Sequence, residues 1–280
     1  MITGIDHIGL QVRDFERTVA NYEVIFGRAP NWRGGARGWR QAWFQFDNAA
    51  LDIVAADGDG PAADRIRSDI ESYGEGMWGF GFSVAKLDDA VQLFSRRGLE
   101  FLASETTVTQ GADGTQRSWR IAMMRRKSGN GVALFLVEQA KERWAVPDAK
   151  FGDASVGNLD HIVVQTTDAE RAVALYGGRL GLDLRLDRSN EQWGARQLFF
   201  RCGGAIVEIG ASLKAPANET KDKFGGLAWR VKDAQAAQAR IAAAGINVSE
   251  VRKGRKPGTA VFTVRSGTGG VPTLMLSGNE

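Results

Sequence analysis

"IDHIGLQVRDFERTVANYEVIFGR" (residues 5–28) returns in the second half of the chain as "LDHIVVQTTDAERAVALYGGRLGL" (residues 159–182). Both stretches begin with alternating apolar residues, which predict a strand, and continue through Asp-x-Glu-Arg into helical spacing. The chain has only two histidines, and His7 and His161 hold the same position in the two stretches. Internal similarity of this kind predicts a fold built from duplicated units.

The two copies stay in step beyond the first helix. Residues 40–56 (RQAWFQFDNAALDIVAA) align with residues 196–212 (RQLFFRCGGAIVEIGAS). Each segment is predicted to form two strands joined by a tight turn, because two apolar runs flank Asp-Asn or Gly-Gly. The alignment places Asp52 opposite Glu208, so each copy also carries one acidic residue at a matching position.

A weaker copy follows each strong one. Residues 79–101 and 226–248 both read as a strand followed by a helix, and further strands close each half. The chain therefore comprises four units of one strand, one helix and about three strands. Residues 139–157 lack periodicity and are predicted to be a linker between a first domain, residues 1–138, and a second domain, residues 158–280.

Composition limits the class of protein. The 280 residues are 43% hydrophobic and 25% charged, which is typical of a soluble globular chain of about two domains. The net charge of +3 comes from 36 basic and 33 acidic residues without a basic, aromatic-rich run, so no nucleic-acid partner is expected. No stretch approaches 18 apolar residues and no signal peptide is recognisable, so no membrane partner is expected. Cys202 is the single cysteine, and a cytoplasmic monomer or homodimer is the prediction.

Four tandem units of this kind resemble the vicinal oxygen chelate superfamily, which includes glyoxalases, bleomycin resistance proteins, methylmalonyl-CoA epimerase and extradiol dioxygenases. The resemblance covers nearly the whole chain and rests on the two Asp-His-Ile openings, on the helices that carry Tyr22 and Tyr176, and on the acidic residue of each strong unit. It implies an α+β fold of four βαβββ units that form two half-open mixed β-barrels with helices on the outside. Each barrel would enclose one cleft.

Alternation along the strands predicts which side chains face these clefts. Because successive side chains point to opposite faces of a strand, His7 and Gln11 face away from the apolar side that packs under the helix. The same reading gives this orientation to His161, Gln165, Asp52 and Glu208. In the resembled fold the first and last strands of a unit are neighbours, which implies that His7 lies beside Asp52 and His161 beside Glu208.

In metal-dependent members of the family these positions carry metal ligands. An imidazole and a carboxylate suit a divalent Mn, Fe, Zn or Ni ion, so one such ion is a possible cofactor. The weak units depart from the pattern, because their matching positions hold Gly79 and Gly226 on the first strand and Phe135 and Met275 on the last. Pairing of neighbouring units therefore gives half-sites, and only a first-with-third pairing would bring all four candidate ligands together.

Three functions remain open from the sequence. The His–carboxylate pairs His161–Glu208 and His7–Asp52 can be partial metal sites, or metal-free acid–base dyads in which the carboxylate orients the imidazole. In a third hypothesis the protein only binds a small molecule, as resistance proteins of the family do. A divergent extradiol-type dioxygenase is a further alternative, but that route requires ligands that Gly226 and Met275 do not supply.

Candidate ligand contacts complete the predicted clefts. Phe135, Trp78 and Trp229 can supply aromatic walls. The segment NWRGGARGWR (residues 31–40) is predicted to be a loop at a cleft mouth, where Arg37 and Trp39 can hold an anionic or aromatic ligand.

The sequence thus predicts a small-molecule enzyme of the superfamily. Lyase or isomerase chemistry on a carbonyl, phenolic or carboxylate compound is favoured over oxygen insertion. The pair His161–Glu208 is favoured as the working site, because its carboxylate is the glutamate that the resembled family uses.

Overall fold

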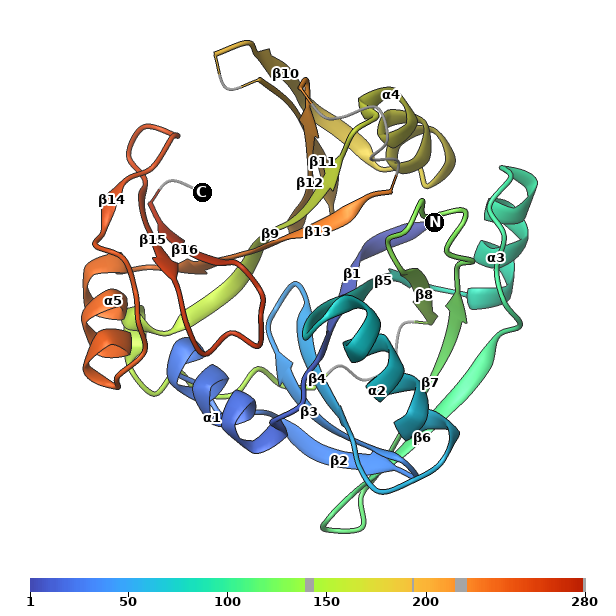
Figure 1. Cartoon of the computed structure of the whole chain (residues 1–280), viewed down its shortest axis with the longest axis horizontal. Coiled ribbons are helices and arrows are strands. Elements are labelled where there is room, and N and C mark those ends of the chain that lie inside the picture. Colours follow the sequence, from blue (N-terminus) through green and yellow to red (C-terminus); the bar gives the residue numbers. More distant parts are fainter. Residues whose placement is uncertain (139–143, 193, 215–220, 279–280) are drawn as a thin grey trace.

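The computed structural model describes residues 1–138, 144–192, 194–214 and 221–278. Figure 1 shows an α+β fold in which two sheets lie side by side with helices around them. This confirms the fold class predicted from the repeats. Within the described ranges, no helix is long and apolar enough to cross a membrane.

The first half forms a closed eight-stranded barrel with the strand order β1-β4-β3-β2-β6-β7-β8-β5. Its elements are β1 (Ile2–Gln11), α1 (Phe15–Phe26), β2 (Trp32–Ala36), β3 (Trp39–Gln45), β4 (Ala50–Ala56), α2 (Pro61–Tyr73), β5 (Gly76–Val84), α3 (Leu87–Arg96), β6 (Glu105–Gly111), β7 (Gln116–Met123) and β8 (Leu134–Glu138). The first unit pairs with the second, through β1–β5 on one side and β2–β6 on the other.

Closure of this barrel differs from the half-open form expected from the sequence. The seam is made where Gly34 and Gly35 of β2 pair with Gly111 and Gln110 of β6. A Cβ on Gly34 would lie 2.3 Å from the Trp32 ring and 2.4 Å from the backbone oxygen of Gln110. Only a residue without a side chain allows this approach, so the glycine pair of the segment 31–40 closes the barrel.

The second half forms an open eight-stranded sheet with the order β10-β11-β12-β9-β13-β16-β15-β14. Its elements are a 3-10 helix η1 (Gly152–Ala154), β9 (Val156–Thr166), α4 (Ala169–Ala172), a π-helix η2 (Val173–Arg179), β10 (Asp183–Asn190), β11 (Ala195–Cys202), β12 (Ala205–Ser212), β13 (Lys223–Val231), α5 (Ala234–Ala243), β14 (Arg252–Lys253), β15 (Ala260–Val264) and β16 (Thr273–Ser277). The third unit pairs with the fourth through β9 and β13. Since β10 and β14 do not pair, this sheet keeps the half-open shape.

The helix of each strong unit begins and ends as the repeat predicts. The Asp14 carboxylate accepts a hydrogen bond from the backbone N–H of Arg17 and caps α1. The helix ends at Gly27, whose φ of 65° suits glycine. In the second copy Asp168 caps α4 in the same way, but the helix continues as a π-helix through the Gly177-Gly178 pair, where helix propensity is low.

One apolar core joins the two halves. The outer faces of the two sheets contribute to it together with α1. Trp229 of β13 is fully buried against Phe26 of α1 and Phe46, with ring centroids 4.8 and 4.9 Å apart. The buried Tyr22 hydroxyl donates to the backbone oxygen of Thr268 across the same boundary.

Three local expectations need correction. Residues 31–40 form the hairpin of β2 and β3 rather than a loop, with a turn at Arg37-Gly38. Helix α2 was not predicted, although Pro61 after Gly60 is a helix-start signal. Residues 139–143 of the expected linker lie outside the described residues, and β9 already begins at Val156 within its remainder.

Candidate functional site

A β-bulge at each Asp-His dipeptide shapes both clefts. Between Ile5 and Ile8, β1 advances three residues while its partner β5 advances two. In the second half, β9 advances two residues from Leu159 to His161 while β13 advances one. A bulge breaks the strict alternation of side chains, so neighbouring residues can approach one another. The Asp6 and Asp160 carboxylates therefore reach the Nδ1 atoms of the following histidines, at 2.7 and 2.6 Å.

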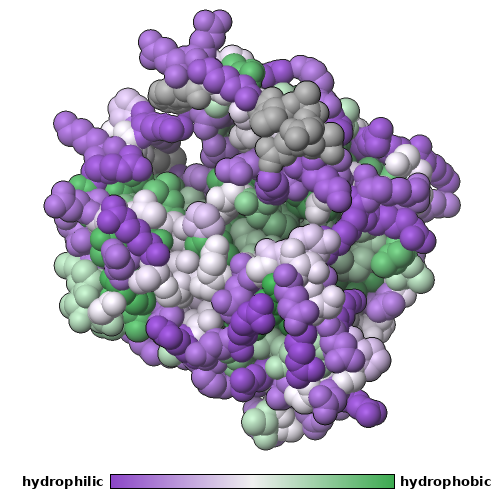
Figure 2. Space-filling view, viewed as in Figure 1, coloured by the Kyte–Doolittle hydropathy of each residue, from purple (hydrophilic) through white to green (hydrophobic). Residues whose placement is uncertain are grey.

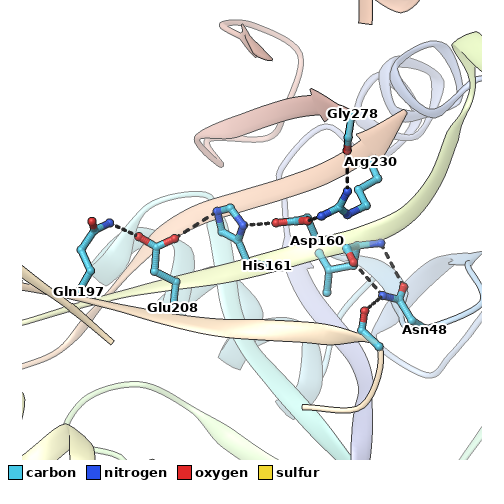
Figure 3. Close-up of polar contacts among 9 residues, drawn as sticks. Asn48, Asp160, His161, Gln197, Glu208, Arg230 and Gly278 are labelled. Carbon is cyan, nitrogen blue, oxygen red and sulfur yellow. Dashed lines mark hydrogen bonds and ion pairs between the residues drawn. The ribbon is translucent and has the colours of Figure 1, made fainter. Parts of the chain in front are cut away.

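In the second cleft His161 lies between two carboxylates. Its Nε2 atom is 3.4 Å from Oε2 of Glu208, which projects from β12 beside Val163. The predicted juxtaposition of His161 and Glu208 is thus present in the structure. Arg230 of β13 contacts the other oxygen of Asp160 at 2.5 Å. The order of contacts is Arg230, Asp160, His161 and Glu208, as Figure 3 shows.

The chain of contacts continues on the far side of Glu208. The side-chain amide of Gln197, on β11, donates to Oε1 of Glu208 at 2.7 Å. Arg188, on β10, donates in turn to the Gln197 amide oxygen at 2.9 Å. Both ends of the chain are therefore guanidinium groups, and each carboxylate oxygen of Glu208 has a partner.

Charges around Asp160 keep this carboxyl ionised. Burial alone would raise the pKa of Asp160, but the hydrogen bond and charge of His161, together with Arg230, hold the pKa below its usual range. An ionised Asp160 accepts the Nδ1 proton of His161, which fixes the tautomer of the ring. Nε2, which faces Glu208, is then the ring nitrogen at which a proton can be taken up or released.

The second cleft is accessible and basic. The side chains of His161 and Glu208 are 18% and 14% exposed, and they line a cavity of about 680 Å³. Five basic residues also line it, against the two acids Asp160 and Glu208: Arg188, Arg230, Arg252, Arg255 and Lys256. In the space-filling view hydrophilic side chains border the hollow between β10 and β14 (Figure 2). Phe199, Val261, Leu274 and Leu276 supply apolar walls. The cleft therefore suits a small anion with an apolar part.

The first barrel holds the matching groups in a more enclosed setting. His7 is 2% exposed, and the centroid of its ring lies 4.8 Å from that of the Trp43 ring and 5.0 Å from that of the Phe135 ring. Asp52 lies on β4 opposite Gly9, and its buried Oδ1 atom has no hydrogen-bond partner among the described residues. Burial raises the pKa of the Asp52 carboxyl, despite the opposing attraction of His7 and Arg117. No ring nitrogen of His7 lies within 4 Å of a carboxylate oxygen of Asp52, in contrast to His161 and Glu208 in the second cleft.

The predicted ligand contacts separate into three groups. Gln11, Trp39 and Trp78 line the cavity of the first barrel together with His7 and Asp52. Phe135 is buried inside the barrel and stacks on Trp78 at 5.3 Å. Arg37 and Gln165 are exposed and line neither cavity, and Trp229 belongs to the core between the halves.

The register also corrects one matching position of the weak units. Ala228 of β13 pairs with Leu274, and Trp229 pairs with Met275. Met275 and Trp229 lie in the core, whereas Leu274 lines the second cavity. A shift of one residue reverses the face of a strand, and this is why Met275 was misplaced. Leu274 is no better a metal ligand, so the prediction of a half-site stands.

The unit pairing excludes the four-ligand arrangement. His7 and His161 belong to different sheets, so the first-with-third pairing does not occur. Within the described ranges, no group of three or more His, Cys, Asp or Glu side chains is placed to hold a metal ion. Catalytic metal sites commonly use three protein ligands, and here each cleft supplies two. The donor set therefore does not fit an ion held by the protein alone.

Several site residues were missed in the sequence. Asp6 and Asp160 stood beside the histidines in the repeated dipeptide, but strict strand alternation turned them to the other face. Gln197 and Arg230 come from strands read only as structural. Arg117 stacks on Trp43 at 3.5 Å inside the first barrel, and no sequence pattern singled it out.

Comparison with known proteins links this geometry to one family. A family model described as the glyoxalase/bleomycin resistance protein/dioxygenase superfamily matches residues 6–119 and 160–262, one match in each half. No curated protein matches the chain.

Solved structures share the fold at low sequence identity. A variant of 4-hydroxymandelate synthase from Streptomyces coelicolor has a TM-score of 0.70 and 16% identity, over 100% of this chain and 93% of that chain. The 2,3-dioxygenase LapB from Pseudomonas sp. KL28 has a TM-score of 0.68 and 13% identity, over 100% and 93%. A Mn(II)-bound glyoxalase from Novosphingobium aromaticivorans has a TM-score of 0.65 and 16% identity, over 99% and 82%.

Proposed function

Because the chain belongs to the glyoxalase/bleomycin resistance protein/dioxygenase superfamily, we propose that it is an enzyme that transfers a proton to and from a small carbonyl compound in its second cleft. The reaction class is isomerisation or elimination, and the substrate carries a negative group such as a carboxylate. The observation that carries this proposal is the unbroken chain of contacts through Asp160, His161 and Glu208 at the floor of a basic cavity.

The His161–Glu208 contact supports proton transfer. Two unprotonated atoms, a ring nitrogen and a carboxylate oxygen, would repel each other at 3.4 Å. One proton shared by the two groups turns this repulsion into the attraction of an ion pair. The pair can give this proton to a carbonyl oxygen or a leaving group and take one back later, which is general acid–base catalysis.

The groups around the pair would position it. Asp160 holds the Nδ1 side of the ring, and Gln197 holds the second oxygen of Glu208. Neither side chain can therefore rotate without breaking a second hydrogen bond. Groups held in this way need little reorganisation during the reaction, which lowers the barrier.

The basic residues of the cleft define the charge of the substrate. Arg188 and Arg230 lie at opposite ends of the chain of contacts, and Arg252 lines the same cavity. Guanidinium groups suit carboxylates because they offer paired donors in one plane. A carboxylate bound there would place the adjacent carbonyl group near the floor, and the arginines would stabilise negative charge that develops on its oxygen.

Hydrogen exchange tests the proposal without knowledge of the natural substrate. A panel of 2-oxo and 3-oxo carboxylic acids with aliphatic or phenyl side chains is incubated with protein in deuterium oxide, and loss of the C–H signal next to the carbonyl is followed by proton NMR. We expect exchange above the buffer rate for at least one member, and a loss of about 10²- to 10⁴-fold in Glu208→Gln and His161→Asn.

Glu71→Gln is the matched control, because Glu71 is exposed on α2 in the other half. Near-ultraviolet circular dichroism would check that each variant is folded. Exchange at the buffer rate for every panel member, or equal exchange in wild type and Glu208→Gln, would overturn the proposal.

A further inference from the structure

The first barrel contains a cavity that the proposed proton transfer does not use. It measures about 570 Å³ and is lined by His7 and Asp52 at depth and by three tryptophans, Trp39, Trp78 and Trp119. A volume of this size and predominantly apolar walls are typical of sites for drug-sized molecules. None of these residues belongs to the second sheet, so this cavity and the second cleft can be tested separately.

Two buried polar atoms on the wall of this cavity lack hydrogen-bond partners among the described residues. Oδ1 of Asp52 and Nε1 of Trp78 lie on the cavity wall without a hydrogen bond. Outside the cavity lining, both amide atoms of Gln41, Oγ1 of Thr109 and Nη1 of Arg117 also lack partners in the part of the chain that the structure describes. All three belong to strands of the same barrel, and Gln41 and Thr109 are at most 1% exposed. Buried polar groups in folded proteins are nearly always paired, so the two atoms on the cavity wall require an explanation.

We propose that the closed barrel is a binding site for an uncharged aromatic or aliphatic molecule that carries one hydrogen-bonding group. The apolar body would lie between the tryptophans, and the polar group would reach Asp52 and Trp78. A hydroxyl or N–H group can donate to Oδ1 of Asp52, and a ligand oxygen can accept from Nε1 of Trp78.

The charges of the lining favour a neutral ligand. Three acids, Asp52, Asp69 and Glu105, are balanced by three bases, Arg65, Arg125 and Arg126. The second cavity, by contrast, has five bases against two acids. Burial raises the pKa of Asp52, which favours its uncharged form at the floor. The cation inside the barrel, Arg117, is already attracted by Asp52 and Asp6, so an anion would lose its hydration there without gaining an unpaired cation.

Helix α2 gives this cavity a cover. It supplies Ala62, Arg65, Ile66 and Asp69 to the lining and lies in the connection between β4 and β5, residues 57–75. Figure 1 shows it in front of the barrel strands. The corresponding connection of the second half, between β12 and β13, comprises only residues 213–222. The longer connection of the first half thus adds wall to a cavity that the duplicated units alone would leave more open.

A neutral fluorescent probe tests the site directly. N-phenyl-1-naphthylamine is titrated into the full chain, and we expect a saturable rise in fluorescence at one probe per chain. Two variants narrow the cavity: Ala62→Trp replaces a half-buried lining residue of α2, and Val54→Trp replaces a buried residue of the wall. Each should reduce the affinity at least about 10-fold, and Asp52→Leu should reduce it about 2- to 10-fold through loss of one hydrogen bond. Asp89→Asn, an exposed residue of α3, is the control.

Competition identifies the ligand class. The uncharged 1-naphthol should displace the probe at a concentration at least about 10-fold lower than 1-naphthoate, which carries a charge. The proposal is overturned if the probe shows no saturable binding, if naphthoate competes as well as naphthol, or if Ala62→Trp binds the probe like wild type. Ala62 is only half-buried, whereas Val54 is buried, so this variant remains informative should Val54→Trp fail to fold.

Discussion

Replacing Asp160 with asparagine removes one negative charge from the centre of the second cleft without changing its shape. The Asp160 carboxylate contacts Nδ1 of His161 at 2.6 Å and the Arg230 guanidinium at 2.5 Å. An asparagine oxygen can still accept from His161, but its amide group would then face Arg230 donor to donor. The substitution therefore costs one charge-assisted hydrogen bond and leaves Arg230 without an anionic partner at this position.

The loss of one charge-assisted hydrogen bond sets the expected change in the free energy of unfolding. A hydrogen bond to a charged group contributes about 1.5–3 kcal/mol, and Arg230 is 30% exposed, so water replaces part of the loss. We expect the free energy of unfolding to fall by about 1.5 kcal/mol. Urea unfolding followed by tryptophan fluorescence measures it, provided that the denaturant slope is the same in both proteins. Asp183→Asn is the control, because Asp183 pairs with Arg185 and Arg201 on the exposed surface, where each pair contributes about 0.2–1 kcal/mol.

The pH dependence sharpens the test. The folded protein holds the pKa of Asp160 below its usual range, so the stabilisation is fully present above the unfolded pKa of about 3.9. It is lost as the pH falls through the lower folded value. The difference between wild type and Asp160→Asn should be constant from pH 8 to pH 5 and shrink under more acidic conditions. A loss no larger than that of Asp183→Asn, or one that persists undiminished in strong acid, would refute this account of the site.

Other consequences concern metal content, the first barrel and the boundary between the halves. After incubation with Mn, Fe, Zn or Ni and dialysis, plasma mass spectrometry should find well under one equivalent of metal per chain, because each cleft offers only two ligands. One equivalent of bound metal that is lost in His161→Ala would contradict this prediction. Asp52→Asn should have a higher free energy of unfolding than wild type at pH 8, and this difference should shrink towards pH 4. The pKa of Asp52 is raised in the folded state, so wild type loses stability as the pH rises through that pKa. Urea unfolding at both pH values measures the difference, and a difference that grows in acid would contradict the prediction. Tyr22→Phe should lower the free energy of unfolding by about 1–2 kcal/mol, because the hydrogen bond to Thr268 is lost. Both halves should unfold in a single urea transition, and that transition should shift to lower urea concentration. Two separate transitions, of which only one shifts, would show that the halves unfold independently.

The repeat made most of the fold predictable. Two copies of the same pattern located β1, α1, β9 and the strands that carry Asp52 and Glu208, because apolar alternation and helix caps act locally. The closure of the first barrel was not predictable in this way. It depends on Gly34 meeting Gly111 across a distance of many residues in sequence, and no local signal reports which strands will pair.

The site was predicted in part for a similar reason. The adjacency of His161 and Glu208 was implied by the resembled fold, in which the first and last strands of a unit are neighbours. The roles of Asp6 and Asp160 were hidden because a bulge, set by the pairing with β5 and β13, overrides simple alternation. A shift of one residue also reverses the predicted face of a strand. For this reason Met275 was assigned to the wrong face, and Trp229 was predicted to lie in the cleft although it lies in the core.

The core that Trp229 shares with Phe26 and Phe46 makes the chain equivalent to a dimer fused into one polypeptide. In a symmetric dimer of identical chains, every substitution appears in both sites at once. A fused pair is free of that constraint, because each half has its own codons while the other half still supplies its packing partner. One half can therefore close into a barrel while the other stays open, and the two cavities can come to differ in charge without any loss of the assembly that holds them together.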